Sequence, residues 1–119
     1  KNESNEEMAG EDWSEDRHIA IHYFDDGGWA DEPELLVLIN MERGPVDFTL
    51  PDGRTWGRIV DTQPYYDTPG TIDESGGYFD DEPTVDPYIS ANITLDTPTA
   101  IEDGTYQVPA NTIVIFEEL

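Results

Sequence analysis

The sequence of 119 residues contains no cysteine, so the chain has no disulfide, no thiolate nucleophile and no thiolate metal site. Basic residues are almost as scarce. Lys1 is the only lysine, and the five Lys and Arg residues face 28 Asp and Glu residues, which gives a net charge of −23. A field of this sign repels nucleic acids and anionic membrane surfaces. We therefore expect neither nucleic acid nor a membrane as a partner.

Long hydrophobic runs are missing as well. No apolar stretch approaches the roughly 20 residues that a membrane-spanning helix needs, and residues 1–4 are not followed by the apolar core of a signal peptide. The length fits one domain, because a chain of this size can bury roughly two-thirds of its unfolded surface. The apolar share of 36%, with three Trp, six Tyr and four Phe, supplies the material for one core.

The acidic excess has three explanations. An acidic, lysine-poor surface resembles those of proteins from salt-loving organisms, in which dense salt screens the self-repulsion of the chain. A secreted or cell-surface protein with an ordinary acidic bias has a similar composition, and so does a surface rich in bound calcium. Composition alone leaves all three open.

Alternation of apolar and polar residues predicts an all-β fold. In the first predicted strand Ile19 and Ile21 share one face, and we expect one face of this strand to be buried. The run at 35–39 is apolar throughout, which is typical of a central strand. Together with the turn residues between them, the segments predict one antiparallel β-sandwich of about six to eight strands. The predicted strands cover residues 17–24, 35–39, 46–50, 54–61, 88–95, 105–108 and 112–116.

Three connecting segments stand out. Residues 1–16 are rich in acids and form a lead-in to the single domain at 17–119. Residues 63–87 are rich in Pro, Gly and acids without periodicity, which predicts a long excursion. The sequence Pro-Asp-Gly at 51–53 is the strongest turn signal, and we expect the strands on either side of it to pair as a hairpin.

The sequence predicts no metal and no cofactor. His18 and His22 lie four positions apart on a strand, which separates them by about 13 Å, too far to share one ion without a bend. The acidic runs at 25–27 and 80–82 offer oxygen ligands of the kind that calcium prefers, but neither has the register of a known calcium loop. We interpret these runs as solvated loops.

Aromatic side chains outside the predicted strands are the candidate carbohydrate-binding residues. Trp29 lies in a predicted turn, and Tyr65 and Tyr66 are adjacent in the excursion. Flat rings of this kind stack on the C–H faces of sugars. The same rings would be exposed in an excised domain that normally packs against another domain, and we favour packing. Trp56 lies within a strand and is expected to pack in the core.

Four stretches of sequence occur in a characteristic order. They are Glu-Met-Ala-Gly-Glu-Asp-Trp at 7–13, the pair Leu-Leu-Val-Leu-Ile-Asn at 35–40 and Pro-Val-Asp-Phe-Thr-Leu-Pro at 45–51, Trp-Gly-Arg-Ile-Val-Asp-Thr at 56–62, and Tyr-Gln-Val-Pro-Ala-Asn-Thr-Ile-Val-Ile at 106–115. Together they resemble the C-terminal β-sandwich domain of isoamylase and glycogen-debranching enzymes, in the α-amylase superfamily (glycoside hydrolase family 13). The sequence departs from the family pattern at Asn111, where an Arg is frequent.

The resemblance implies a non-catalytic accessory domain. In such enzymes a (β/α)₈ barrel hydrolyses the α-1,6-glucosidic bond with a carboxylate nucleophile and a carboxylic general acid. The family's catalytic segments Gly-x-Arg-x-Asp and Asn-His-Asp have no counterpart here, so we predict no catalytic residue. The implied partner is the barrel of the same polypeptide, and α-glucan is a second candidate partner. A glycogen-debranching enzyme would favour the cytoplasm, and secretion stays open.

Two other classes of function remain as alternatives. One is a carbohydrate-binding module that holds α-glucan with exposed aromatic rings near the excursion. The other is an extracellular adhesion-type sandwich that uses its acids to bind calcium. Coplanar exposed rings would favour the first, and a melting temperature that rises with calcium would favour the second.

Overall fold

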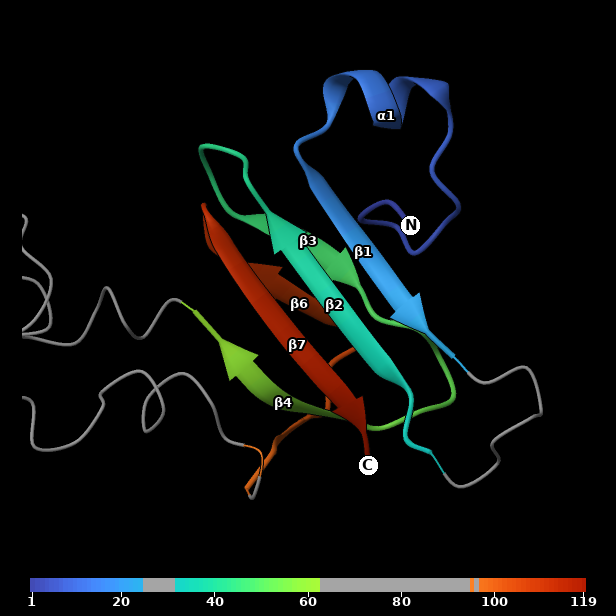
Figure 1. Ribbon diagram of the computed structural model, residues 1–119, viewed down its shortest axis with the longest axis vertical. Helices are drawn as coiled ribbons and strands as arrows, with labels where there is room; N and C mark the ends of the chain where they lie inside the picture. The colour runs from blue at the N-terminus through green and yellow to red at the C-terminus, as the bar shows by residue number, and fades with distance from the viewer. Residues whose placement is uncertain (25–31, 63–94, 96) are drawn as a thin grey trace, which may run out of the picture.

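The computed structural model describes residues 1–24, 32–62, 95 and 97–119, and nearly all of their regular structure is antiparallel β-sheet (Figure 1). This confirms the predicted all-β class. No helix among the described residues has the length and apolar character needed to cross a membrane. The elements are α1 (Gly10–Glu15), β1 (His18–Tyr23), β2 (Leu35–Asn40), β3 (Val46–Thr49), β4 (Trp56–Asp61), β5 (Thr99–Ile101), β6 (Thr105–Val108) and β7 (Thr112–Glu118).

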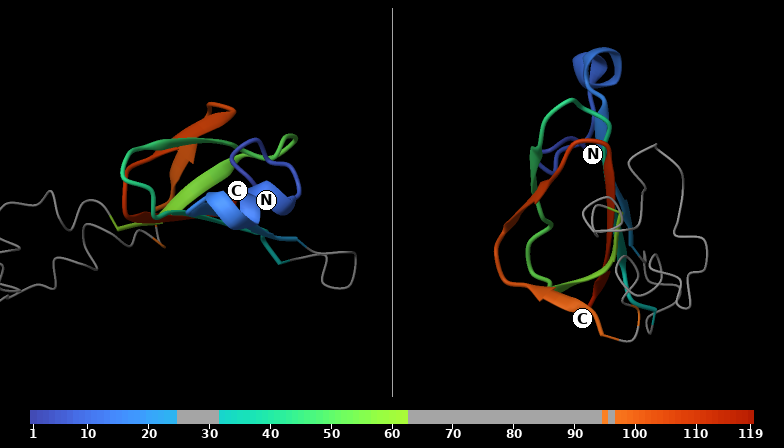
Figure 2. Two further views of the ribbon diagram at one scale, coloured as in Figure 1. Left: turned by 90° about the horizontal axis from the view of Figure 1, so that it is seen from above. Right: turned by 90° about the vertical axis from the view of Figure 1, so that its left-hand side faces the viewer.

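The strands form two sheets of unequal size. The larger sheet has the order β1-β2-β7-β4-β5, and the smaller sheet pairs β3 with β6. Every pairing is antiparallel. Figure 2 shows the two sheets as separate layers seen from the side. The described strands therefore have the two-layer arrangement of a β-sandwich, and β2 is a central strand of the larger sheet, as its apolar run predicted.

The hydrophobic core lies between the two layers. The small sheet contributes the fully buried Phe48 and Val108, and the large sheet contributes side chains from β1, β2, β4 and β7. Trp56 is only 2% exposed, and its indole N–H donates a hydrogen bond of 3.2 Å to the carbonyl oxygen of Pro51. The expected packing of Trp56 is thus confirmed. The buried members of the core are Ala20, Leu36, Leu38, Phe48, Leu50, Trp56, Val108, Val114 and Phe116.

Asn40, at the end of β2, is a fully buried polar side chain. Its amide group donates to the carbonyl oxygens of Gly44, Val108 and Pro109 at 2.9, 3.0 and 3.1 Å, and its Oδ1 accepts from the Glu42 N–H at 2.8 Å. A buried polar group is tolerated when its hydrogen bonds are satisfied in this way. Asn40 therefore ties the β2–β3 loop to the end of β6 and links the two sheets.

The expected hairpin across residues 51–53 is wrong. β3 pairs with β6 in the small sheet, whereas β4 pairs with β5 and β7 in the large sheet. The turn does exist, and Gly53 has the positive φ of 78° that favours glycine. It carries the chain from one sheet to the other, because the hydrogen-bonding partners of both strands come from the C-terminal part of the sequence.

Two elements are additions to the predicted set. β5 is only three residues long, and α1 is a helix of six residues in which the Ala9 N–H donates to Asp12 Oδ2 at 2.8 Å. Both are too short to produce a periodic pattern in the sequence. The expected excursion at 63–87 and the expected strand at 88–95 fall outside the described residues, apart from residue 95.

Candidate functional site

The outer face of the small sheet is polar. Asp47 and Thr49 of β3 lie opposite Gln107 and Thr105 of β6 in the register of the sheet, and all four residues are exposed. The Gln107 side chain donates a hydrogen bond of 3.0 Å to Asp47 Oδ1. This alternation of buried apolar and exposed polar residues is typical of an antiparallel sheet with one face in water. The small sheet is therefore adapted to solvent.

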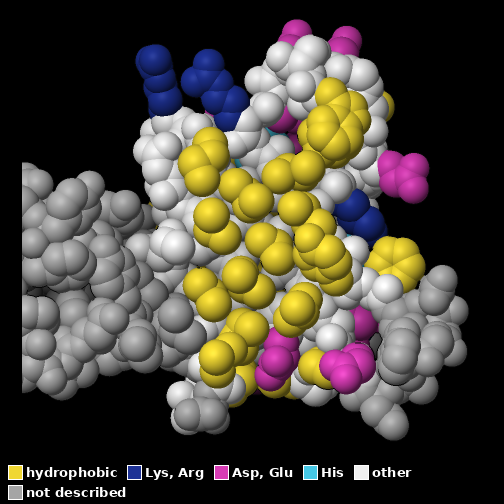
Figure 3. Space-filling view, in the orientation of Figure 1, with side chains coloured by type: hydrophobic (Ala, Val, Ile, Leu, Met, Phe, Trp, Pro, Cys, Tyr) yellow, Lys and Arg dark blue, Asp and Glu magenta, His cyan; other side chains and the backbone are white. Residues whose placement is uncertain are grey.

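The outer face of the large sheet is apolar. Its neighbouring strands place Ile19, Ile39 and Ile113 in one row across the sheet. A second row, two residues away, contains Ile21, Val37, Ile115 and Val60. Side chains alternate between the two faces of a strand, so these residues point away from the buried core positions. In Figure 3 hydrophobic side chains cover this face over β1, β2 and β7. We call the seven residues Ile19, Ile21, Val37, Ile39, Val60, Ile113 and Ile115 the outer patch.

The outer patch extends across four strands. Strand spacing gives it a width of about 14 Å across the strands, and its two rows lie about 7 Å apart along them. Tyr23 and Leu35 extend the patch at one end, with 59% and 36% of their surfaces exposed. Glu117 is the one charged residue that β1, β2, β4 and β7 place on this face, although the chain has 28 acids. A contiguous apolar surface of this kind marks a site of interaction rather than a solvated face.

The inner face of β1 carries its two histidines, on either side of the buried Ala20. The His18 ring lies edge-on to Phe48 with ring centres 5.9 Å apart, and the His22 ring lies edge-on to Trp56 at 5.6 Å. The face of β1 that is turned into the sandwich is thus the one with Ala and His. The isoleucines of this strand belong to the outer patch.

His22 is part of an ion-pair network at the rim of the sandwich. Its Nε2 lies 2.7 Å from Glu34 Oε2, and Arg54 Nη2 lies 2.7 Å from the other oxygen of Glu34. Burial alone would raise the pKa of Glu34, but the hydrogen bonds from Arg54 and His22 outweigh it and hold this pKa below its ordinary value. Glu34 is therefore a stabilised carboxylate that already has a cationic partner.

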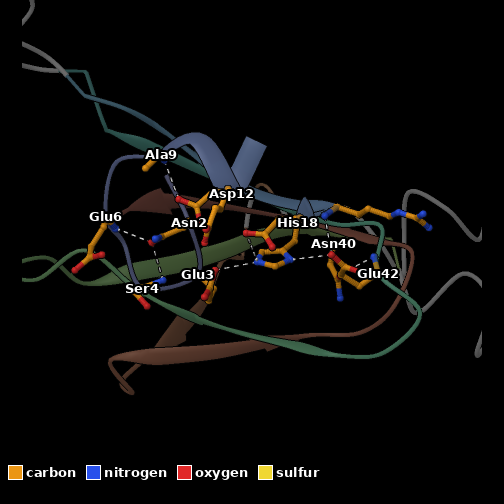
Figure 4. A network of polar contacts seen from close by, with 12 residues as sticks. Asn2, Glu3, Ser4, Glu6, Ala9, Asp12, His18, Asn40 and Glu42 are labelled. Atoms are coloured by element: carbon orange, nitrogen blue, oxygen red, sulfur yellow. Dashed lines mark hydrogen bonds and ion pairs between the residues drawn. The ribbon is translucent and has the colours of Figure 1, made fainter. Parts of the chain in front are cut away.

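His18 lies among carboxylates at the other end of β1 (Figure 4). Its Nε2 is 2.9 Å from Glu3 Oε2, and its Nδ1 is 3.2 Å from Glu42 Oε1. Burial would lower the pKa of His18, but the hydrogen bonds to Glu3 and Glu42 outweigh burial and raise it. The bond to His18 also lowers the pKa of Glu3, and the Arg17 backbone N–H followed by His18 lowers that of Glu42. Glu3 and Glu42 together carry more negative charge than one imidazolium ring can neutralise.

The structure separates the residues that the sequence singled out. His18 and His22 contact different carboxylates. The candidate carbohydrate-binding residues Trp29, Tyr65 and Tyr66 lie outside the described residues, and so do the acidic runs at 25–27 and 80–82.

Two features of the structure were missed in the sequence. The outer patch could have been found from the run at 35–39, because a strand that is apolar on both faces is typical of a sheet covered on both sides. The carboxylates around His18 gave no signal, because Glu3 and Glu42 are 15 and 24 positions away along the chain.

Comparison with known proteins adds no relative. No protein-family model matches the chain, and no curated protein matches it either. The contrast between the two outer faces is therefore the main structural guide to function.

Proposed function

We propose that the chain is a non-catalytic accessory domain that packs through its outer patch on the catalytic (β/α)₈ barrel of a debranching glycoside hydrolase in the same polypeptide. The observation that carries this proposal is the apolar outer face of the large sheet, opposite a small sheet whose outer face is polar. Burial of the patch stabilises the barrel, and hydrolysis of the α-1,6-glucosidic bond belongs to the barrel alone.

The chemistry of the outer patch favours a protein partner over a sugar. The core of a lasting interface between domains is apolar and poor in charge, and the patch consists of Ile and Val residues from four strands. Sugar binding needs flat aromatic rings together with polar groups that reach the hydroxyls. Branched aliphatic side chains offer neither, so they support packing of one domain on another.

The resemblance supplies the identity of the partner. Its most specific stretch forms β2 and β3, which hold Asn40 and Phe48 at the centre of the described fold. Its third stretch begins at Trp56, which fills the core between the sheets. Three of the four stretches that carry the resemblance contribute β2, β4 and β7 to the large sheet, and the outer patch is the reverse side of that sheet.

The first test is the reading frame that encodes the chain. The proposal expects a (β/α)₈ barrel with its catalytic carboxylates upstream of Lys1, and it expects the full polypeptide to hydrolyse pullulan or amylopectin. A full polypeptide without a barrel would overturn the debranching assignment. The outer patch would then have to pack on a different partner.

The second test compares one substitution on each outer face in the full polypeptide. Ile115→Lys places a charge in the middle of the outer patch, whereas Thr105→Lys places the same charge on the polar face of the small sheet. We expect Ile115→Lys to lower the temperature at which the barrel loses hydrolytic activity by about 5 °C or more, and Thr105→Lys to leave it unchanged. Equal behaviour of the two variants would contradict packing through the patch.

A sugar titration separates this proposal from a binding module. We expect the nuclear magnetic resonance signals of the chain to be unchanged by maltoheptaose at millimolar concentration. Saturable shifts confined to Trp29, Tyr65 and Tyr66 would instead assign α-glucan binding to the chain.

A further inference from the structure

A cluster of one histidine and three carboxylates lies at the edge of the sandwich (Figure 4). Glu3 comes from the lead-in, Asp16 from the residues between α1 and β1, His18 from β1, and Glu42 from the loop after β2. His18 Nε2 lies 2.9 Å from Glu3 Oε2 and 3.8 Å from Asp16 Oδ2. One ligating atom of each of these three residues lies within 4.8 Å of the others. Separate segments of the chain therefore bring three metal-ligating atoms to one point.

Glu42 orients the imidazole ring from the opposite side. Its Oε1 accepts a hydrogen bond of 2.6 Å from the Arg17 backbone N–H and lies 3.2 Å from His18 Nδ1. A carboxylate only accepts, so a neutral ring donates to Glu42 or to Glu3 but not to both, and the lone pair of its other nitrogen then faces a carboxylate. A lone pair that faces carboxylate oxygens repels them unless a cation lies between. That cation is either a proton or a metal ion.

The negative charge of the cluster is offset less directly than that around His22, because Arg17 acts on Glu42 without a salt bridge. Among the described residues, no Lys or Arg side chain forms a salt bridge with Glu3, Asp16 or Glu42. The network around His22 differs in this respect, because Arg54 pairs with Glu34 there. Two histidines on the same strand thus have carboxylate partners, and the carboxylates around the one at the first position of β1 form no salt bridge with Lys or Arg among the described residues.

The spacing of the cluster suits a small divalent ion. Tetrahedral Zn²⁺ with bonds of about 2.0–2.1 Å holds its ligand atoms about 3.3–3.4 Å apart, a value within the range that the three ligating atoms span. The Glu3 backbone is fixed by a hydrogen bond of 2.7 Å from the Thr49 N–H to its carbonyl oxygen, while its side chain is half exposed and free to adjust. Glu42 holds His18 as an outer carboxylate holds a metal-bound histidine.

We propose that Glu3, Asp16 and His18 bind one divalent transition-metal ion of the zinc type, with Glu42 as the positioning residue of the imidazole. A mixed set of one nitrogen and two carboxylate oxygens suits Zn²⁺ or Co²⁺, whereas calcium prefers oxygen ligands throughout. His18 faces the inner side of β1, opposite the outer patch, and the site does not depend on the proposed role in a debranching enzyme.

The proposed ion joins the lead-in to the sandwich. Glu3 lies in the lead-in, 15 positions from His18, and the neighbouring Lys1 pairs with β1 through the hydrogen bond from the Ala20 N–H to its carbonyl oxygen. An ion that binds only the folded arrangement shifts the equilibrium towards it. Bound metal therefore fixes the path of residues 1–16 along the edge strand.

Zinc titration of the chain, prepared without a histidine tag, tests the site. Isothermal titration calorimetry in excess potassium chloride should show one saturable Zn²⁺ site, and Co²⁺ should produce visible absorption bands of low coordination number. At saturating Zn²⁺ we expect the melting temperature to rise by roughly 5 °C or more. The absence of a saturable site at micromolar to millimolar Zn²⁺ would overturn the proposal and leave a protonated imidazole among carboxylates.

Matched variants assign the site to its ligands. His18→Gln and Glu3→Gln should each weaken Zn²⁺ binding by about tenfold or more and remove the cobalt bands. His22→Gln should preserve both, because Arg54 already neutralises the carboxylate beside that ring. Glu3→Gln changes a half-exposed side chain, so it covers the case in which His18→Gln fails to fold. Equal zinc binding in all three variants, or displacement of Zn²⁺ by equimolar Ca²⁺, would mean diffuse binding to surface acids and would overturn the proposal.

Discussion

The two outer faces of the sandwich differ although the same chain builds both. The small sheet presents Asp47, Thr49, Thr105 and Gln107 to solvent, while the large sheet presents seven Ile and Val residues. A chain with 28 acids has ample polar residues for both faces. The acids are therefore not spread evenly, and the face from which they are nearly absent is the one that a partner would cover.

The contrast between the two outer faces also explains why the isoleucines of β1 point outward. In an isolated sandwich the more apolar face of an edge strand belongs inside, yet β1 directs Ala20 and two histidines inward and Ile19 and Ile21 outward. The strand is consistent with a sheet that has two covered faces. One face is covered by β3 and β6, and we propose that the partner domain covers the other.

The largest expected effect comes from truncating neighbouring residues of β2 that point to opposite faces of the large sheet. Leu38 is fully buried, so Leu38→Ala should lower the free energy of unfolding by about 3 kcal/mol through lost burial and a cavity. Val37 belongs to the outer patch, and Val37→Ala should cost less than about 1 kcal/mol in the isolated chain. Urea unfolding in potassium chloride measures both values. A loss of similar size for Val37→Ala would show that the patch is already covered within the chain.

The next largest effect is expected at Asn40, the buried side chain that links the two sheets. Asn40→Leu would leave three carbonyl oxygens without the donor they share and the Glu42 N–H without its acceptor, so we expect a loss of about 2 kcal/mol. Thr49→Val makes a comparable polar-to-apolar change on the exposed face and should stay within about 0.5 kcal/mol. Thermal and urea unfolding of both variants provides the measurement, and a neutral Asn40→Leu would show that water replaces the side chain.

These cases show how much of the fold the sequence could predict. Local alternation identified the strand at 46–50, because a side-chain period of two is imposed by the strand itself, and β-branched residues identified the strand at 112–116. It could not tell which sheet the strand after Gly53 would join, since that depends on β7, about 50 residues later. For the same reason the cluster around His18, assembled from segments 15 and 24 positions away, has no pattern in the sequence.

A smaller effect is expected at Glu34, which precedes β2 beside the end of the outer patch. Because the pKa of Glu34 in the folded chain is below its ordinary value of 4.5, the folded state binds fewer protons and the carboxylate stabilises the fold above that pH. This contribution is lost as the pH falls through the lowered pKa. Glu34→Gln should therefore cost about 1 kcal/mol at pH 7 and nothing in strong acid.

The pH series needs a carboxylate without such partners as its control. Glu102 lies exposed in the turn between β5 and β6, and Glu102→Gln should leave the free energy of unfolding unchanged at neutral pH. His22 and Arg54 face Glu34 directly, and Glu118 lies near the Arg54 guanidinium at 4.0 Å, so these groups set the electrostatic environment. A difference between wild type and Glu34→Gln that persists below pH 3 would point to packing rather than charge.

The last comparison concerns the turn that carries the chain from the small sheet back to the large one. Asn111 lies between β6 and β7 with a φ of 53°, a left-handed conformation that Asn tolerates and Gly adopts freely. Asn111→Gly should change the free energy of unfolding by about 0.5 kcal/mol or less, whereas Asn111→Val should cost about 1–2 kcal/mol, because a β-branched side chain is strained there. If Asn111→Val unfolds at the same urea concentration as the wild type, the turn relaxes without cost. The crossover would then place little constraint on the separation of the two outer faces.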